Sequence, residues 1–319
     1  MLCFKKASAK VVFFYYLFPE LKKSCSICFF LYKTIFLPKI TKTQMHTSAM
    51  IFAAGLGTRL YPLTANKPKA LVEYQGKTLL EHAITKVMDA GIQHIVINVH
   101  HFGEQIIDFV NQHHFNAKID ISDEREMLMD TAGGLKHAEH FFTNCDQILL
   151  YNVDVISSID LKRFAEKQKG EGRKEKGIRR KEEGNGRISP SNFEGVPEGR
   201  GSLYDNIATL AVQNRKTTRY FLFKEPEMRL CGWENTQTHE KKICYEVEKS
   251  IPLAFSGIHI VDKKILDFIP KNEKISFTPL YLELAKNHVI QGYLHDEDSW
   301  QDMGKLEGAL RTTPVQLVN

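Results

Sequence analysis

The sequence predicts an α/β fold, in which a mixed, mostly parallel sheet lies between helices on both faces in a three-layer arrangement. The apolar run at residues 49–54 ends in glycines and is typical of a buried strand. Apolar residues then recur at helical spacing from Leu79 to Met88, and Gly91 follows where a C-terminal helix cap belongs. A further apolar run at 94–99 completes a strand–helix–strand unit. This rhythm favours a mostly parallel sheet that is covered on both faces.

The remaining elements are expected from the same patterns. A helix is expected at 103–113, with Ile106, Ile107 and Val110 on one face. Further strands are expected at 117–122, 147–151, 207–212, 219–223, 230–234, 252–261 and 289–294, and helices at 277–287 and 306–310.

We expect one domain at residues 49–310, with an N-terminal extension at 1–48, a tail at 311–319 and one interruption. Residues 166–203 consist largely of Gly, Lys, Arg and Glu and hold too few apolar side chains to form a core, which indicates a low-complexity insertion. Because acidic residues are interleaved with the basic ones, we interpret this insertion as a solvated linker rather than a nucleic-acid-binding tail.

The extension at 1–48 is aromatic and rich in lysine. Its apolar run at 11–18 is interrupted by Lys22 and Lys23 before it reaches the roughly 20 residues of a membrane-spanning helix. It also lacks a clear small-residue cleavage site of the kind that ends a signal peptide. We therefore expect no stable membrane insertion. Our hypothesis is that the native protein starts at Met45 or Met50, and an intact mass that includes Met1 would disprove it.

Charge and cysteine usage exclude several classes of protein. The net charge is +5, but residues 1–48 carry +7 and residues 162–200 carry +5, which leaves −7 on the rest of the chain. An acidic body argues against a nucleic-acid-binding protein. The six cysteines form no dense framework, so we expect a cytoplasmic protein. Cys25 and Cys28 form a CxxC pair, but no second pair of ligands accompanies them, as a zinc site would require.

The glycine-rich segment 51–64 begins within the first predicted strand and continues beyond its end. A glycine turn at this place lets backbone N–H groups approach phosphate oxygens without an intervening Cβ. Arg59 can bind phosphate through two hydrogen bonds, and Lys69 supplies a compact positive charge. The spacing is neither that of a Walker A loop nor that of a dinucleotide-binding GxGxxG, because Leu60 replaces the third glycine. The two glycines alone are equally compatible with a simple tight turn.

The whole string from 53 to 71 resembles the signature of sugar-1-phosphate nucleotidyltransferases, A-A-G-x-G-T-R-x-x-P-L-T followed by P-K. The resemblance extends from Met50 to about Leu310, apart from the insertion. It implies a Rossmann-like mixed sheet and an enzyme that joins an NTP to a sugar 1-phosphate and releases pyrophosphate. It also implies contacts of Arg59 with the leaving phosphates and of Lys69 with the α-phosphate. The expected nucleotide-binding residues are Ala53, Ala54, Gly55, Leu56, Gly57 and Thr58.

Two further segments resemble motifs of the same family. The segment 128–135 is similar to its L-x-T-x-G-G motif, which implies that Thr131 and Gly133 contact the base. The segment 254–259 is similar to its F-x-G-[IV] strand, which implies that Gly257 lies against the sugar. The family's E-K-P segment has only a poor counterpart at residues 224–226.

The resemblance also implies a Mg²⁺ site. Asp154 ends an apolar strand, so it is expected at the sheet edge where open α/β sheets bind ligands. Asp302 lies in Trp300-Gln301-Asp302-Met303-Gly304, which resembles the family's W-x-D-x-G. Two carboxylates together with nucleotide phosphates suit Mg²⁺. Asn152 is expected to contact the nucleotide or the sugar, and Val153 stands where the family often has glycine.

The resemblance is strongest to N-acetylmuramate-1-phosphate uridylyltransferases and to mannose- and heptose-1-phosphate guanylyltransferases, which implies UTP or GTP as the nucleotide and a role in cell-envelope or glycan metabolism. Two other functions stay open at this point. A glycosyltransferase of related fold would carry a metal motif after a similar strand. A non-catalytic sensor of sugar nucleotides would keep the pocket without the chemistry.

Overall fold

The computed structural model describes residues 46–170 and 206–305. The extension up to residue 45, the Cys25–Cys28 pair, most of the predicted insertion, the predicted helix at 306–310 and the tail lie outside the described residues. Two predicted boundaries can be compared with the structure. The first strand begins at Thr47, two residues before the predicted start of the domain, and the helix that precedes the insertion extends to Gly170.

Five α-helices and fourteen strands are described. The helices are α3 (Leu79–Asp89), α4 (Gly103–Gln112), α5 (Asp130–His137), α6 (Leu161–Gly170) and α7 (Phe277–Leu284). The strands of the large sheet are β1 (Thr47–Phe52), β4 (His94–Val99), β5 (Lys118–Asp123), β6 (Gln147–Asn152), β8 (Asn206–Gln213), β9 (Arg219–Lys224), β10 (Arg229–Asn235), β11 (Glu240–Ile243), β12 (Ser250–Asp262) and β13 (Val289–Leu294). Two small sheets pair β2 (Glu73–Tyr74) with β3 (Lys77–Thr78) and β7 (Val155–Ser157) with β14 (Trp300–Asp302).

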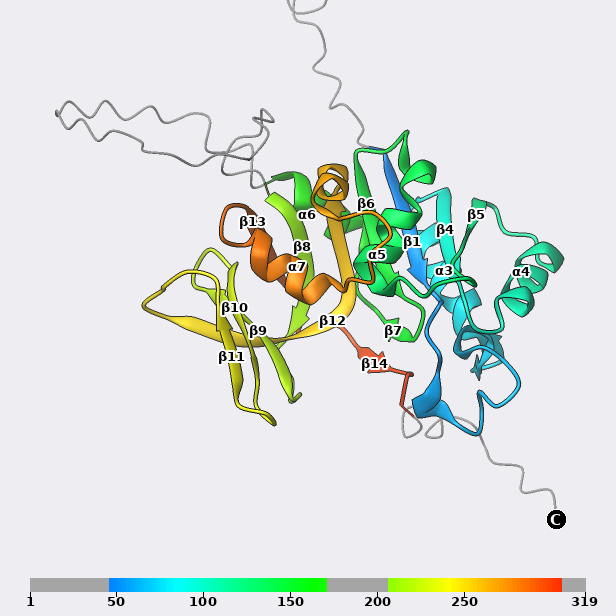
Figure 1. The fold of residues 1–319 in the computed structure, drawn as a ribbon, viewed down its shortest axis with the longest axis horizontal. Helices are drawn as coiled ribbons and strands as arrows, with labels where there is room; N and C mark the ends of the chain where they lie inside the picture. The colour runs from blue at the N-terminus through cyan, green and yellow to red at the C-terminus, as the bar shows by residue number, and fades with distance from the viewer. Residues whose placement is uncertain (1–45, 171–205, 306–319) are drawn as a thin grey trace, which may run out of the picture. The chain divides into compact units, whose positions relative to one another are not determined.

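The large sheet is mixed, and its two halves differ (Figure 1). Its strand order is β11-β10-β13-β8-β12-β6-β1-β4-β5, with β9 pairing β10 and β12. The neighbours β5, β4, β1 and β6 are parallel, as predicted. In the other half only β8 and β13 are parallel, so the prediction of a mostly parallel sheet was wrong there. Strands β9, β10 and β11 follow one another through short turns, and short turns connect only antiparallel neighbours.

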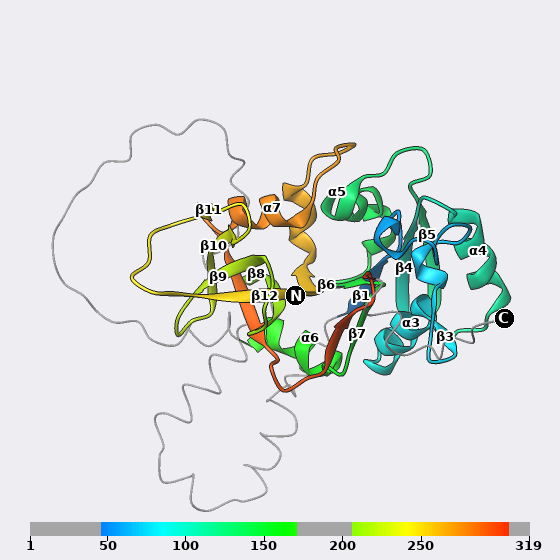
Figure 2. The ribbon, with the colours of Figure 1, turned by 90° about the horizontal axis from the view of Figure 1, so that it is seen from below.

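Helices pack on both faces of this sheet. Alternate residues of β1 point to opposite sides, as strand geometry requires. Ala49 and Ile51 join a buried cluster with α3 and α6, whereas Met50 and Phe52 join a second cluster with α5 and α7. Figure 2 shows these two pairs of helices on opposite sides of the strands. The α/β class predicted from the sequence is thereby confirmed.

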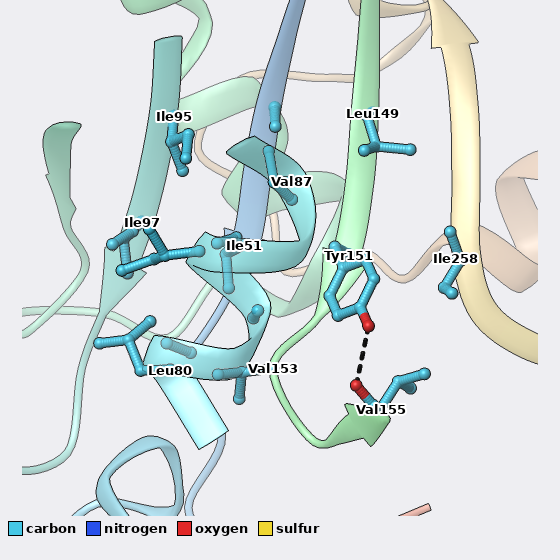
Figure 3. Close-up of a cluster of buried hydrophobic side chains, with 14 of the residues drawn as sticks. Ile51, Leu80, Val87, Ile95, Ile97, Leu149, Tyr151, Val153, Val155 and Ile258 are labelled. Atoms are coloured by element: carbon cyan, nitrogen blue, oxygen red, sulfur yellow. Dashed lines mark hydrogen bonds between the residues drawn. The ribbon is translucent and has the colours of Figure 1, made fainter. Parts of the chain in front are cut away.

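Figure 3 shows the first cluster, where side chains of α3 pack against β1, β4 and β6. Tyr151 is its largest member and is almost fully buried. Its hydroxyl donates a hydrogen bond of 2.8 Å to the Val155 carbonyl, so this buried polar atom is satisfied. That bond ties the end of β6 to β7, on either side of Asp154. No helix among the described residues has the length and apolar character needed to cross a membrane.

Candidate active site

The parallel pairing of β1 and β6 places two predicted site segments next to each other. Phe52 and Asn152 are paired residues at the ends of these strands. The chain therefore leaves the sheet at the same edge in the glycine-rich segment and in the segment that carries Asp154. Ligands of open α/β sheets bind at this carboxyl edge.

Lys69 and Asp154 meet at this edge. The Lys69 ammonium lies 2.8 Å from Oδ2 of Asp154, and the two side chains are only 14% and 10% exposed. Lys69 is held in a short 3-10 helix that begins directly after Pro68. The structure thus brings together two residues that the sequence predicted separately, one for the phosphates and one for a metal.

Asp302 reaches the same place through the small sheet of β7 and β14. In that sheet Asp302 pairs with Val155, the residue after Asp154, and the Met303 N–H donates to the Asp154 carbonyl at 2.8 Å. Gly304 packs against both carboxylates. A Cβ on it would lie 2.3 Å from Oδ2 of Asp154 and 2.9 Å from Oδ1 of Asp302. These two oxygens are therefore no more than about 5.2 Å apart.

The glycine-rich segment forms an open turn beside this pair. Gly57 has φ +68°, and a Cβ there would lie 3.0 Å from Thr64 Cγ2, so a side chain would be strained by the backbone conformation and would press on Thr64. The Thr64 hydroxyl closes the turn by donating to the Gly57 carbonyl at 2.9 Å. The backbone N–H groups of residues 55–58 have no acceptor among the described residues. They are free to donate to an anion.

Ala53 and Ala54 differ from the rest of the predicted nucleotide-binding residues because both are buried and their N–H groups are already bonded. The side-chain oxygen of Asn98 accepts from Ala53 at 2.8 Å and from Ala54 at 3.4 Å. Asn98 in turn donates to Glu124 at 2.8 Å, and the other oxygen of Glu124 accepts from the Met129 N–H at 3.2 Å. Burial raises the pKa of Glu124, against the opposing effect of these hydrogen bonds.

Sequence reasoning missed Asn98 and Glu124. Their buried bridge joins the start of the glycine-rich segment to the segment predicted to contact the base. One signal was available, because Asn98 stands near the carboxyl end of the predicted strand at 94–99 and Glu124 follows the predicted strand at 117–122 by two residues. A polar residue at that edge commonly supports a ligand site.

The structure places Thr131 and Gly133 in internal contacts. The Thr131 hydroxyl accepts from the Phe277 N–H at 3.2 Å, and the Gly133 N–H donates to the Ile275 carbonyl at 3.0 Å. A Cβ on Gly133 would lie 2.4 Å from the Glu273 carbonyl oxygen. This glycine is therefore required where α5 packs on the segment before α7. Neither Thr131 nor Gly133 lines the cavity that Arg59, Asn152, Asp154, Gly257 and Asp302 share, and neither do Lys69 and residues 53–58.

Asn152 and Gly257 lie against each other in that cavity. Gly257 has φ +74°, and a Cβ there would lie 2.9 Å from the Asn152 side-chain nitrogen. Between Asn152 and Asp154, the Val153 side chain is fully buried in the core cluster below the sheet edge. Its φ is not positive, so the position that is often glycine in the resembled family accepts valine without backbone strain.

The cavity has a volume of about 1060 Å³. Five residues that were predicted to contact phosphate, sugar or metal line it, namely Arg59, Asn152, Asp154, Gly257 and Asp302. It is also lined by residues that the sequence did not single out, from the β8–β9 connection, from β9, from β10 and from α7: Arg215, Lys216, Thr217, Thr218, Arg219, Trp233 and Thr278. Arg59 is exposed at its rim.

Arg215 is the most firmly held of the unpredicted residues. Its guanidinium carbon lies 3.6 Å from the centre of the Trp300 ring, and Nη2 donates to the Phe255 carbonyl at 2.7 Å. Trp300 is itself fixed by a 2.8 Å hydrogen bond from Nε1 to the Ser256 carbonyl. Burial lowers the pKa of Arg215, and the nearby Asp302 carboxylate opposes that shift. An arginine remains charged under such conditions, so the cavity holds a fixed cation.

Comparison with known proteins agrees with this geometry. Residues 48–183 match the family model for nucleotidyl transferases. This part of the chain is therefore similar to nucleotidyl transferase domains. The matched residues include the glycine-rich segment, Lys69 and Asp154. Asp302 and the cationic residues 215–219 lie beyond them.

Curated relatives match a part of the chain of comparable length. N-acetylmuramate alpha-1-phosphate uridylyltransferase of Caulobacter vibrioides is 43% identical over 99 residues, which cover 30% of this chain and 41% of that protein. Mannose-1-phosphate guanyltransferase of Hypocrea jecorina is 37% identical over 126 residues, which cover 39% of this chain and 34% of that protein. The match thus spans about two fifths or less of the length of these relatives.

Solved structures resemble a larger part of the chain. HddC from Yersinia pseudotuberculosis, complexed with GMP-PN, has a TM-score of 0.56 at 19% identity, covering 84% of this chain and 98% of that one. UDP-glucose pyrophosphorylase from Acinetobacter baumanii has a TM-score of 0.61 at 14% identity, covering 84% and 92%. At these identities the likeness shows the fold alone. The likeness in fold extends beyond the segment matched by the family model.

Proposed function

We propose that this chain is a three-layer, Rossmann-like enzyme that joins an NTP to a sugar 1-phosphate, forming a nucleotide sugar and pyrophosphate. One observation carries the proposal. A lysine, two carboxylates and a glycine turn with free N–H groups converge at the carboxyl edge of the sheet, although Asp302 is distant from the others in sequence. The names of the curated relatives, a uridylyltransferase and guanyltransferases of sugar 1-phosphates, support the same reaction with UTP or GTP.

The donor set at this edge fits Mg²⁺. Asp154 and Asp302 supply hard carboxylate oxygens no more than about 5.2 Å apart. Mg²⁺ is usually held by one or two carboxylates, with phosphates and waters completing its shell. Among the described residues no cluster of three or more potential ligands exists, which agrees with a metal that depends on the nucleotide for the rest of its coordination. When bound, the ion would neutralise charge on the phosphates of the NTP.

The chain's own residues would position the reacting groups. The N–H groups of residues 55–58 and the Arg59 guanidinium would bind the β- and γ-phosphates, which leave as pyrophosphate. Lys69 would contact the α-phosphate, whose oxygens gain charge in the transition state. The sugar phosphate oxygen is already anionic and needs no general base. Its attack breaks the α–β phosphoanhydride bond, so catalysis rests on orientation and charge stabilisation.

Lys69 and Asp154 face each other at the carboxyl edge of the sheet. The 2.8 Å ion pair keeps both charges oriented toward the place where the α-phosphate would lie. On nucleotide binding the Lys69 ammonium would exchange the carboxylate for phosphate oxygen, and Asp154 would become available to the metal. We place the reaction in the cytoplasm, which agrees with the free thiols of Cys145, Cys231 and Cys244 in the described part of the chain.

The test is pyrophosphate release with a panel of NTPs and sugar 1-phosphates in the presence of Mg²⁺. We expect release with a matched pair and its loss in Asp154→Ala and in Asp302→Ala. Asp108→Ala is the control, because Asp108 is an exposed carboxylate of α4 outside the cavity. Nucleotide binding without release would identify a sensor. Transfer of sugar from a nucleotide sugar, without pyrophosphate, would identify a glycosyltransferase.

A further inference from the structure

The turn between β13 and β14 holds a buried histidine that the proposed reaction does not use. His295 directly follows β13, and its side chain has no exposed surface. It does not line the cavity. Figure 2 shows the chain passing from β13 through this turn into β14, beside β7. Because β14 carries Asp302, the position of the turn affects where this carboxylate lies.

The backbone of this turn is fixed to the end of β8. The His295 N–H donates to the Val212 carbonyl at 3.1 Å. The Gln213 side-chain nitrogen donates to two carbonyls of the turn, that of His295 at 3.1 Å and that of Asp298 at 2.9 Å. His295 therefore projects its imidazole from a fixed point beside the sheet.

The two ring nitrogens of His295 have different surroundings. Nε2 lies 2.8 Å from the Ser256 hydroxyl oxygen. Nδ1 is buried and has no hydrogen-bond partner among the described residues, and the nearest carboxylate oxygen of Asp298 lies 3.6 Å away. Burial lowers the pKa of His295, an effect that Asp298 and Asp296 oppose and Arg215 reinforces, so the ring is neutral at pH 7. A proton on Nδ1 faces the carboxylate, which leaves Nε2 to accept from the Ser256 hydroxyl.

Ser256 lies in an irregular stretch of β12. The pairing of β12 with β8 shifts register after Phe255 and resumes at His259. Gly257, within this stretch, has φ +74°. A strand that is irregular in this way loses ladder hydrogen bonds and needs other contacts to fix its backbone. The contact of Ser256 with His295 is one of them, and the stretch that it fixes lines the cavity.

The backbone at Ser256 also supports the aromatic and cationic part of the cavity wall. The Ser256 carbonyl accepts a 2.8 Å hydrogen bond from Nε1 of Trp300. The centre of the Trp300 ring lies 3.6 Å from the guanidinium carbon of Arg215, which donates in turn to the Phe255 carbonyl at 2.7 Å. His295 thus acts on this wall from behind, through the Ser256 hydroxyl.

A carboxylate, an imidazole and a serine hydroxyl in this order also form the triad of many hydrolases. Two observations argue against a nucleophile here. Ser256 has no exposed surface, so its hydroxyl cannot reach a substrate in the cavity. At 3.6 Å, the Asp298 oxygen is too far from Nδ1 to form the hydrogen bond that orients a triad histidine. The contact between His295 and Ser256 therefore holds the strand and does not activate the hydroxyl.

We infer that His295 is a positioning residue for the sugar 1-phosphate, because it holds Ser256 and thereby the wall formed by Gly257 and Arg215. The inference rests on the proposed function and goes beyond it, since it assigns a role to a residue outside the cavity. Loss of His295 removes no group that contacts substrate, so it weakens binding without abolishing the reaction. The glycine-rich segment is supported separately through Asn98, so the effect falls on the sugar 1-phosphate and not on the NTP.

The experiment compares His295→Asn with His295→Gln. An asparagine amide reaches about as far as Nδ1 of histidine and a glutamine amide about as far as Nε2, so only glutamine keeps a partner for Ser256. Pyrophosphate release is measured with UTP or GTP and with glucose, mannose or N-acetylmuramate 1-phosphate, using the pair with the highest wild-type kcat/KM. In His295→Asn we expect the KM for the sugar 1-phosphate to rise at least about fivefold, with kcat and the KM for the NTP within about twofold of wild type. His295→Gln should restore the KM for the sugar 1-phosphate to within about twofold of wild type.

Two further variants accompany this pair. Ser256→Ala removes the other side of the same contact, so it should raise the same KM, and the double variant Ser256→Ala/His295→Asn should be no worse than the single ones. His94→Asn is the matched control. It removes a 2.8 Å hydrogen bond between Nε2 of His94 and Asp120 at the start of β4, the end of that strand away from the site. Both KM values should stay unchanged in it, whatever its thermal unfolding temperature.

Three results would overturn the inference and leave the proposed function standing. They are a wild-type KM for the sugar 1-phosphate in His295→Asn, an equal rise in both KM values, and a His295→Gln variant as impaired as His295→Asn. If circular dichroism shows His295→Asn to be unfolded, Ser256→Ala decides, and a wild-type KM in it would overturn the inference. Wild-type protein that releases no pyrophosphate with any pair would overturn both the inference and the proposed function.

Discussion

The hydrogen bonds of the buried Asn98 side chain should stabilise the start of the glycine-rich segment, which we propose binds the nucleotide. Asn98→Leu keeps the branching of the side chain at Cγ but removes the acceptor for the Ala53 N–H and the donor to Glu124, both at 2.8 Å. An unpaired buried N–H costs about 1–3 kcal/mol, and a hydrogen bond lost by a charged group about 1.5–3 kcal/mol. The expected loss of unfolding free energy is therefore about 3–5 kcal/mol, a large fraction of the stability of a typical domain.

Asn98→Asp separates the contribution of the hydrogen bond from the Ala53 N–H from that of the hydrogen bond to Glu124. The new carboxylate still accepts from Ala53, but it faces Glu124, whose pKa burial already raises. Two adjacent carboxylates raise the pKa of one of them further. A carboxyl group whose pKa is higher in the folded state stabilises the fold below its unfolded pKa, and this contribution is lost as pH rises through the folded value. The variant should therefore be closer to wild type at pH 5 than at pH 7.

Urea unfolding monitored by circular dichroism measures both effects, on wild type and variants at each pH. The KM for the NTP should also rise in Asn98→Leu, because the first residues of the glycine-rich segment lose their anchor. An unfolding free energy of Asn98→Leu within about 1 kcal/mol of wild type would refute the reasoning, since a buried unpaired donor costs at least that much. So would an Asn98→Asp variant whose destabilisation is the same at pH 5 and pH 7.

Three other substitutions test the site. Gly304→Ala should lower kcat about hundredfold or more with little change in thermal unfolding, because its Cβ would lie 2.3 Å from Oδ2 of Asp154 and would force this carboxylate to move. An unchanged kcat would contradict this arrangement. Lys69→Met should lower kcat about hundredfold or more, while NTP affinity measured by calorimetry changes less. A large loss of NTP affinity with an unchanged kcat would exclude a role of Lys69 in the transition state. Gly133→Ala should destabilise the fold by about 2–4 kcal/mol in urea unfolding, because its Cβ would meet the Glu273 carbonyl at 2.4 Å, and a neutral effect would show that α5 can shift.

The sequence predicted the parallel half of the sheet well and the other half poorly. The strands β1, β4 and β6 are each mainly apolar because both faces of these strands are buried, and this pattern is readable from sequence. For β8 to β13, the pairing of each strand depends on contacts between segments joined by turns. The periodicity of apolar residues within one strand does not predict which strand it pairs with. The small β7–β14 sheet joins two three-residue strands from distant parts of the chain. No sequence pattern predicts this pairing.

The residues of the site were likewise predicted only in part. Lys69, Asp154 and Asp302 were found through motifs, and the structure places them together. Gly133 matched a motif as well, yet the structure uses it for close packing, since a glycine required by a neighbouring carbonyl looks the same in sequence as one required by a ligand. Arg215 was missed because its importance comes from stacking on Trp300, a contact between distant segments of the chain.

The central claim is that these residues transfer a nucleotidyl group to a sugar phosphate. Its most direct test is mass spectrometry of the products formed from the NTP and sugar 1-phosphate of the best pair, with Mg²⁺. The account predicts a nucleotide sugar and pyrophosphate in equal amounts, with neither formed when the sugar phosphate is omitted or Asp302 is replaced by alanine. Pyrophosphate accompanied by free nucleoside monophosphate, with no nucleotide sugar, would contradict it.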